Sequence, residues 1–203
     1  MSESPLITDL AAQQKWNVRY QENPPGQLPQ AAYVLREYQH LLPASGCALD
    51  LACGLGGNAL LLAARGLETW AWDIADSAIT RLQATALQQG VTLHTAVRDV
   101  VAQPPSARSF DVLVVSRFLD RSLAPALIQA LKPGGLLLYQ TLTQLTVGDV
   151  HKPSNPAYLL APQELLRLFQ PLRLVVYREE ADLGEITQGW RNEALLIGQR
   201  LPD

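Results

Sequence analysis

Short apolar segments alternate with helical patterns along most of this chain, and that alternation restricts the fold more than any other feature. Seven segments have the length and composition of strands: Cys47 to Ala52, Glu68 to Trp72, Val91 to Val97, Phe110 to Ser116, Leu136 to Leu142, Leu172 to Glu180 and Asn192 to Arg200. Helical spacing predicts helices over Thr8 to Tyr20, Gln30 to Leu42, Asn58 to Arg65, Asp76 or Ser77 to Gly90, Ser122 to Leu131 and Pro162 to Phe169.

This order predicts an α/β fold: a doubly wound, mostly parallel seven-stranded sheet with helices on both faces. The last two strand segments have no helix between them, so the last strand is expected to be antiparallel. A chain of 203 residues suits one structural unit. We expect residues 1–43 to form an N-terminal helical cap over a main domain that covers residues 44–203.

Composition excludes several classes of function. The formal net charge is -3 with no basic tract, which predicts no nucleic-acid partner. No apolar segment approaches the roughly 18 residues that a membrane-spanning helix needs. Cys47 and Cys53 are the two cysteines, and no His/Cys spacing typical of a metal site is present, so we expect no metal. Together with the absence of a signal-like N-terminus, this pattern favours the cytoplasm.

The turn after the first strand is rich in glycine and has the character of a nucleotide-binding turn. Gly54, Gly56 and Gly57 allow the backbone to approach a ligand closely, and the following helix directs free N–H groups toward it. Asp73 ends the second strand about 20 residues further on, where a carboxylate accepts hydrogen bonds from ribose hydroxyls. The two features together predict a ligand of the adenosine type, although the turn alone is also typical of a plain strand-to-helix connection.

Asp50, directly before the turn, distinguishes two nucleotide classes. A carboxylate there would repel the pyrophosphate of a dinucleotide but attract a ligand that carries an ammonium group. The turn also satisfies only part of the G-x-G-x-x-G fingerprint, with Ala59 at its last position. A dinucleotide-dependent oxidoreductase therefore remains an alternative, but a weaker one.

The stretch "DLACGLG" resembles the first motif of the class I S-adenosylmethionine-dependent methyltransferases, D-x-G-x-G-x-G, with Ala52 in place of the first glycine. Further motifs follow in the order of that family: "AWDIA", "VRDV", "FDVLVVS" and "LKPGG". The resemblance implies S-adenosyl-L-methionine as cofactor. It implies that Asp73 holds the ribose, that Asp99 and Val100 contact the adenine, and that the remaining cofactor contacts come from Asp50, Ala52, Gly54, Gly56, Asn58, Ile74 and Ser116.

A narrower resemblance involves both ends of the chain. The segments "KWNVRY", "NPAYLLAPQELLRLF" and "VVYREE" are similar to the small bacterial tellurite-resistance and thiopurine methyltransferase-like group. In that group the N-terminal segment covers the cofactor. The resemblance therefore implies that Trp16, Arg19 and Tyr20 form part of a lid.

The residues that would act on the methyl acceptor are less clearly marked. His151 lies in a long irregular stretch, Thr143 to Ala161, and a solvated loop histidine is its plainer interpretation. Arg117 and Arg121 follow the fourth strand, where forked hydrogen bonds could hold an anionic substrate, or where Arg121 could serve the next helix. We expect methyl transfer to a small molecule, namely a thiol, a chalcogen oxyanion or a small hydroxyl compound. The alternative from another class is a non-catalytic sensor or scaffold that binds the cofactor.

Overall fold

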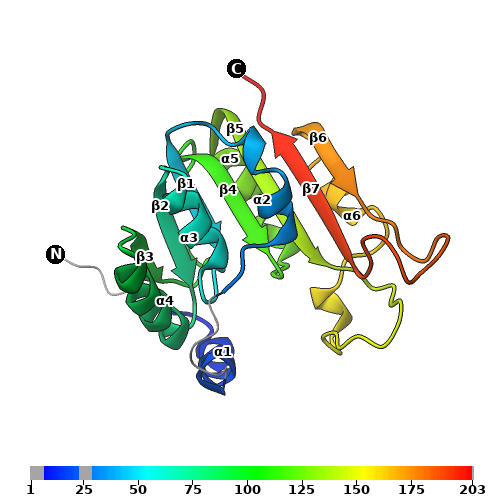
Figure 1. Cartoon of the computed structure of the whole chain (residues 1–203), viewed down its shortest axis with the longest axis horizontal. Helices are drawn as coiled ribbons and strands as arrows, with labels where there is room; N and C mark the ends of the chain where they lie inside the picture. The colour runs from blue at the N-terminus through cyan, green and yellow to red at the C-terminus, as the bar shows by residue number, and fades with distance from the viewer. Residues whose placement is uncertain (1–6, 23–28, 203) are drawn as a thin grey trace.

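The computed structural model describes residues 7–22 and 29–202, and its centre is a sheet of seven strands in the order β3-β2-β1-β4-β5-β7-β6. Figure 1 shows the arrowheads of β1, β2 and β4 at one edge of this sheet, with β7 running the opposite way. The strands are β1 (Cys47–Leu51), β2 (Glu68–Asp73), β3 (His94–Val97), β4 (Phe110–Ser116), β5 (Leu131–Leu142), β6 (Arg173–Arg178) and β7 (Glu193–Gln199).

Strand pairing confirms the predicted fold class. β1 pairs in parallel with both β2 and β4, β3 with β2, and β5 with β4. Only β7 is antiparallel to its neighbours, β5 and β6. In an open sheet of this kind, ligands bind beyond the carboxyl ends of the parallel strands, where the strand order reverses. That point lies between β1 and β4.

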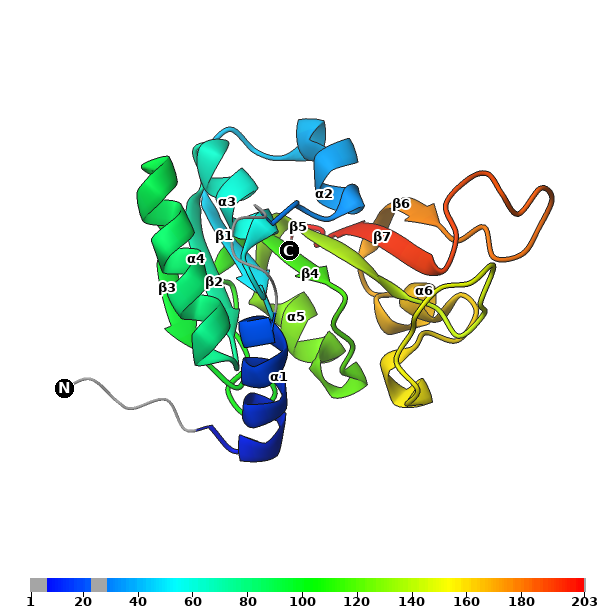
Figure 2. The same cartoon turned by 60° about the horizontal axis from the view of Figure 1, so that its bottom comes forward.

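Helices cover both faces of the sheet (Figure 2). α2 (Tyr33–Glu37), α3 (Gly57–Ala64) and α4 (Asp76–Gln89) lie on one face, while α5 (Ala124–Ala130) and α6 (Glu164–Leu168) lie on the other. Successive strand residues therefore enter two different cores, as the period of two requires. Ala48 packs with Val34 and Leu62 on the α2–α3 face, whereas Leu49 belongs to the cluster of Leu127 on the α5–α6 face.

Several predicted boundaries are wrong by a few residues. The helix expected over Gln30 to Leu42 is split into α2 and a 3-10 turn, Gln39–Leu41, and the helix expected over Pro162 to Phe169 is the shorter α6. The third strand begins at His94 rather than Val91, because it pairs only where β2 lies beside it. β5 begins at Leu131 rather than Leu136, since Leu131 pairs with Phe110 before a shift in register.

The N-terminal helix α1 (Leu10–Glu22) packs differently from the others. It has no buried residue, and Figure 1 shows it below the carboxyl ends of β1 and β2, away from both faces of the sheet. It lies against α4, where Asn17 accepts a hydrogen bond from the Ser77 hydroxyl at 3.0 Å. In residues 7–22 and 29–202 no helix is long and apolar enough to cross a membrane.

Candidate functional site

The glycine turn and Asp73 form one hydrogen-bonded unit. The Gly54 N–H donates to Asp73 Oδ2 at 2.8 Å, and the Ala75 N–H donates to Oδ1 at 2.9 Å. Gly54 and Gly56 have φ values of 53° and 80°, the left-handed region that glycine enters without a steric penalty. Burial raises the pKa of Asp73, while the backbone donors lower it. The carboxylate predicted to bind ribose therefore also holds the turn in place.

Asp50 lies on the other side of the turn and is fully buried. Its Oδ2 accepts from the Ala59 N–H at 3.0 Å, and its Oδ1 accepts from Asn58 Nδ2 at 3.1 Å. Burial raises the pKa of Asp50 to about 7, although these two donors lower it. Asn58 Nδ2 also lies 3.0 Å from Ser116 Oγ, so this amide joins the ends of β1 and β4. Three of the predicted cofactor residues thus form one connected polar cluster.

Asp99 and Val100 follow β3 at the same edge and are both buried. Burial raises the pKa of Asp99, but hydrogen bonds from the Thr8 hydroxyl and from the N–H groups of Val101 and Ala102 bring it below its ordinary value. The Thr8 contact is 2.5 Å. The residue predicted to contact adenine is thus a charged acceptor beside the N-terminal segment.

Residues 7–22, which include α1, contact this edge of the sheet. Gln13 Nε2 donates to the carbonyl of Ile74 at 3.0 Å, next to Asp73. A Cβ added at Gly54 would lie 2.7 Å from the Tyr20 hydroxyl, so Tyr20 contacts the glycine turn directly. Burial and then the charge of Asp73 raise the pKa of Tyr20, which keeps its hydroxyl protonated. Trp16 stacks on Tyr20 at 5.8 Å, while Arg19 is exposed and lies 5.6 Å from the Trp16 ring.

These residues fit the adenosine-type ligand that the sequence predicts. A carboxylate has about four lone-pair sites, so Asp73 keeps acceptor capacity beyond its contacts with Gly54 and Ala75. A second acceptor, Asp99, lies two residues beyond the end of the neighbouring strand, β3. Acceptors at the ends of two adjacent strands match the hydroxyl and amine donors of a nucleoside, and the left-handed turn between β1 and α3 allows close approach of the ligand to the backbone. Among the described residues, no group of three or more His, Cys, Asp and Glu side chains could hold a metal ion.

The three residues considered for contact with the methyl acceptor, Arg117, Arg121 and His151, differ in their surroundings. Arg121 is fully engaged: it donates to both carboxylate oxygens of Glu164 and to the carbonyls of Ala157 and Leu159. It therefore holds the loop before α6 and not the start of the helix that follows it in the chain, which was the expected structural role. His151 is exposed in the 143–161 loop. Arg117 directly follows Ser116, the last residue of β4, and its role toward a substrate stays a prediction.

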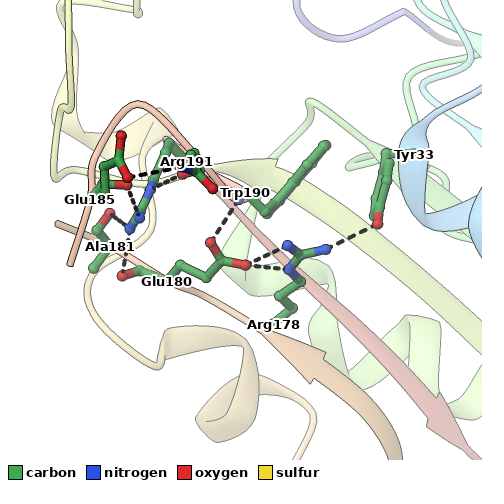
Figure 3. A network of polar contacts seen from close by, with 8 residues as sticks. Tyr33, Arg178, Glu180, Ala181, Glu185, Trp190 and Arg191 are labelled. Atoms are coloured by element: carbon green, nitrogen blue, oxygen red, sulfur yellow. Dashed lines mark hydrogen bonds and ion pairs between the residues drawn. The ribbon is translucent and has the colours of Figure 1, made fainter. Parts of the chain in front are cut away.

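A polar network organises the irregular connection between β6 and β7, residues 179–192 (Figure 3). Arg191 donates to the carbonyls of Glu180, Ala181, Glu185 and Gln188. The Glu180 carboxylate accepts from the Trp190 N–H at 2.7 Å and pairs with Arg178, which in turn reaches the Tyr33 hydroxyl at 3.0 Å.

Asn192 ties this connection to the 143–161 loop. Its side-chain Oδ1 accepts from the Val147 N–H at 2.8 Å, and its Nδ2 donates to the Val147 carbonyl at 2.9 Å. The Asn192 carbonyl also accepts from the Thr143 N–H at 2.9 Å. Both loops beyond the carboxyl end of β5 are therefore joined at one residue.

Sequence reasoning missed two buried polar residues near Arg117. Gln140 and Glu193 lie in β5 and β7 and are both buried. Gln140 Nε2 donates to Glu193 Oε2, and Arg117 Nε donates to Glu193 Oε1 at 3.2 Å. Gln140 was marked in the sequence, because it interrupts the apolar segment "LLLYQTL". Glu193 was not, because it stands beside Asn192 at the start of "NEALLIGQR".

Two surface hollows lie at the opposite, amino-terminal edge of the sheet. One of about 520 Å³ is lined by the ends of α3 and α4 with Glu68 and His94, and one of about 390 Å³ is lined by Asp111, Pro133 and Arg173 among others. Neither contains a predicted cofactor residue. The chemistry of the strand ends, rather than the size of these hollows, locates the site.

Ala52 has a φ of 54°, and this explains why glycine is usual at its position in the motif. We expect Ala52→Gly to change the free energy of unfolding by less than about 1 kcal/mol, because relief of left-handed strain offsets the added freedom of the unfolded chain. Ala52→Val should lower it by about 2 kcal/mol or more, since a β-branched side chain is poorly tolerated there. Urea unfolding of both variants measures this.

Ala96→Val is the matched control, because Ala96 is also half-buried but lies in a regular strand. A β-branched residue is favoured in a strand, so this variant should lie within about 1 kcal/mol of the parent protein. Equal losses for Ala52→Val and Ala96→Val would contradict a strained backbone at Ala52.

The sheet order, the glycine turn after β1 and the acidic residues at the ends of β1, β2 and β3 define the class I S-adenosylmethionine-dependent methyltransferase fold. The chain belongs to the TehB family: the family model described as "Tellurite resistance protein TehB" matches residues 33–194.

The chain is also similar in sequence to named relatives, and it shares its fold with a solved structure. The chain is 28% identical over 145 residues to a protein of Haemophilus influenzae named "Probable S-adenosyl-L-methionine-dependent methyltransferase TehB", covering 68% of this chain and 49% of that protein. It is 30% identical over 149 residues to a ubiquinone biosynthesis O-methyltransferase of Chromobacterium violaceum, covering 67% and 63%. The crystal structure of TehB from Haemophilus influenzae superposes with a TM-score of 0.66 at 22% identity, covering 82% of this chain and 61% of that one. The chain thus spans about half the length of the TehB relative that it matches in sequence.

Proposed function

We propose that this chain is an S-adenosyl-L-methionine-dependent methyltransferase that acts on a small molecule. The observation that carries the proposal is the pair of buried carboxylates, Asp73 and Asp99, at adjacent strand ends beside the left-handed glycine turn. Asp73 and the neighbouring Ile74 would hold the ribose, and Asp99 with Val100 the adenine. The TehB family membership supports the same cofactor.

The methionine end of the cofactor would lie on the Asp50 side of the turn. Asp50 would attract the ammonium group, and Asn58 and Ser116 would hold that carboxylate in place through the bonds described above. Ala52, Gly54 and Gly56 would provide close backbone approach. A cation beside a buried carboxylate offsets part of the cost of burying the charge, which suits the raised pKa of Asp50.

When bound, the cofactor would supply a methyl group to a nucleophilic atom of the acceptor, leaving S-adenosyl-L-homocysteine as the other product. The chain would contribute mainly positioning and the exclusion of water. An acceptor that ionises near neutral pH needs no protein base, whereas a hydroxyl acceptor needs one within hydrogen-bond reach. His151 is the histidine of the loop on this side and stays a candidate.

The N-terminal residues 1–43 would act as a cap over the main domain, residues 44–203. The contacts of Tyr20 with the glycine turn, of Gln13 with Ile74 and of Thr8 with Asp99 support this role for the described part of the segment. Trp16 and Arg19 would line the cap. A cap of this kind would have to open for the cofactor to enter, because Thr8 donates to the carboxylate assigned to adenine. Residues 1–6 and 23–28 lie outside the described residues.

The acceptor is proposed to be a thiol, a chalcogen oxyanion or a small hydroxyl compound. Relatives named for tellurite resistance and for ubiquinone O-methylation support the last two classes. The cytoplasmic location stays a prediction from the free Cys47 and Cys53. The rival functions are a cofactor-binding scaffold without turnover and a dinucleotide-dependent oxidoreductase.

Calorimetry and a product assay test the proposal. We expect S-adenosyl-L-homocysteine to bind and NAD(H) not to bind, and we expect S-adenosyl-L-homocysteine to form from the cofactor with a member of an acceptor panel of thiols, tellurite, selenite and phenols. Binding of NAD(H) alone would support the oxidoreductase. Binding of S-adenosyl-L-homocysteine without turnover on any acceptor would support the scaffold.

A further inference from the structure

Arg117 occupies an unusual position at the end of β4. It follows Ser116 directly and has a φ of 53°, which costs a non-glycine residue of the order of 1 kcal/mol or more. Its backbone N–H donates to the carbonyl of Gln140 at 2.8 Å. Ser116 in turn contacts Asn58 and, through it, Asp50. Arg117 therefore lies directly beside the cluster assigned to the cofactor.

Buried polar groups fix the direction of the Arg117 side chain. Glu193 is only 7% exposed, and a buried carboxylate is costly unless it is paired and hydrogen-bonded. Its Oε1 accepts from Arg117 Nε, and its Oε2 accepts from Gln140 Nε2. Gln140 Oε1 accepts from the Val34 N–H at 2.8 Å, so α2 holds the far end of the chain of contacts. Glu193 is therefore held in place through contacts that involve β7, β5 and α2.

The outer part of the guanidinium remains available. The Arg117 side chain is 74% exposed, and within residues 7–22 and 29–202 its recorded side-chain partner is Glu193 through Nε. A guanidinium has five N–H donors in a planar fork that matches a carboxylate. Arg121, four residues further on, has all three nitrogens bonded within the protein. Of these two arginines, Arg117 is the one that can bind a ligand.

A second cation stands on the same side. Lys152, in the 143–161 loop, donates through Nζ to the carbonyls of Thr143 and Leu145. Burial lowers the pKa of Lys152, and the negative charge of Glu193 raises it. Arg117 and Lys152 together carry two positive charges against the single charge of Glu193.

We propose that Arg117 selects a methyl acceptor that carries a carboxylate, with Glu193 as the residue that positions its guanidinium and Lys152 as a supporting charge. This proposal rests on the proposed function. The carboxylate is bound and not changed: the methyl group goes to another nucleophilic atom of the same molecule, a thiol sulfur or a hydroxyl oxygen.

Matched acceptor pairs test the proposal, each pair being an acid and its neutral amide: 2-mercaptobenzoate with 2-mercaptobenzamide, 3-mercaptopropionate with its amide, and 3,4-dihydroxybenzoate with its amide. We expect kcat/KM for the preferred acid to exceed that for its amide by roughly 10- to 100-fold. Arg117→Gln should remove this preference. Glu193→Gln should raise KM for the acid with little change in kcat, because it loosens binding and not the reaction.

Arg108→Gln is the matched control, because Arg108 also has a left-handed φ, 54°, but precedes β4 at the opposite edge of the sheet. It should keep the preference for the acid. Equal use of acid and amide by the parent protein, or an undiminished preference in Arg117→Gln, would overturn the proposal while leaving methyl transfer itself established.

Binding gives a readout that does not need turnover. In the presence of saturating S-adenosyl-L-homocysteine, calorimetry should detect the acids with the parent protein and with Arg108→Gln, and at least 10-fold weaker binding with Arg117→Gln. Failure of the parent protein to bind any of the acids above their amides would overturn the carboxylate inference. Failure to bind S-adenosyl-L-homocysteine would instead overturn the proposed function.

Discussion

Replacement of Asp73 by alanine is expected to weaken S-adenosyl-L-homocysteine binding by about 100-fold or more. Two hydrogen bonds from the ribose hydroxyls to this carboxylate would contribute roughly 1.5–3 kcal/mol each, and 1.4 kcal/mol corresponds to a factor of ten in affinity. The loss should extend beyond the ribose, because the same carboxylate holds the N–H groups of Gly54 and Ala75. Calorimetric titration measures the affinity.

The same variant should also be less stable by about 1–3 kcal/mol, since two buried N–H groups lose their acceptor. Urea unfolding separates this loss from the loss of affinity. Asp76→Asn is the matched control: Asp76 is an exposed acid three residues further along the chain, in the first turn of α4. It should bind like the parent protein. An affinity of Asp73→Ala within threefold of the parent value would contradict the placement of the ribose.

The buried carboxylate of Asp50 should give the stability of the protein a distinctive dependence on pH. Its pKa is raised to about 7 in the folded chain, against roughly 3.9 in an unfolded one. Between these values the folded protein holds a proton that the unfolded chain has released, so this contribution to stability is complete below about pH 4 and is lost as pH rises through 7. Its slope is about 1.4 kcal/mol per pH unit at most.

Urea unfolding of Asp50→Asn across pH 5 to 8 isolates this effect. The variant should be less stable than the parent protein by about 1–3 kcal/mol at pH 5, because one buried donor, from Asn58 or Ala59, loses its acceptor. The difference in stability should shrink toward pH 8, because there the parent protein is destabilised by the buried negative charge of Asp50. A difference that stays constant over this range would contradict a raised pKa for Asp50.

Asp111→Asn provides a control of opposite sign. Hydrogen bonds from Lys132 and from the Cys47 N–H bring the pKa of Asp111 below its ordinary value, although its partial burial raises it. A carboxyl group whose pKa is lower in the folded protein stabilises the fold at pH values above its pKa in the unfolded chain. That contribution is lost as the pH falls through its pKa in the folded protein. Asp111→Asn should therefore differ most from the parent protein at neutral pH and least near pH 3.

The strand and helix order, the antiparallel last strand and the family were predictable from the sequence, because each depends on a periodic or ordered pattern. Apolar runs such as "FDVLVVS" are buried on both faces and identify central strands on their own. Boundaries were less predictable where pairing decides them: His94 begins β3 only because β2 lies opposite, and Leu131 joins β5 through Phe110.

The positions of Asp50, Asp73 and Asp99 followed from their places at the ends of strands, but their partners did not. Thr8 and Asp99 are 91 residues apart in sequence, and Gln140 and Glu193 are 53 apart. Contacts over such separations depend on how the elements pack, which no local pattern specifies. The cofactor roles of these aspartates remain predictions that the binding experiments test.

Asn192 has a consequence for how new acceptor specificities can arise in this fold. The Asn192 side-chain amide binds both the N–H and the carbonyl of Val147, as the backbone of a neighbouring strand would. The 143–161 loop and the β6–β7 connection are therefore joined into one unit beyond the sheet. A chimera that takes only one of these loops from a relative would lose this junction. Grafting both together, with Asn192 and Val147 included, transfers the complete unit, and recombination between homologous genes would preserve it only when both segments come from the same parent.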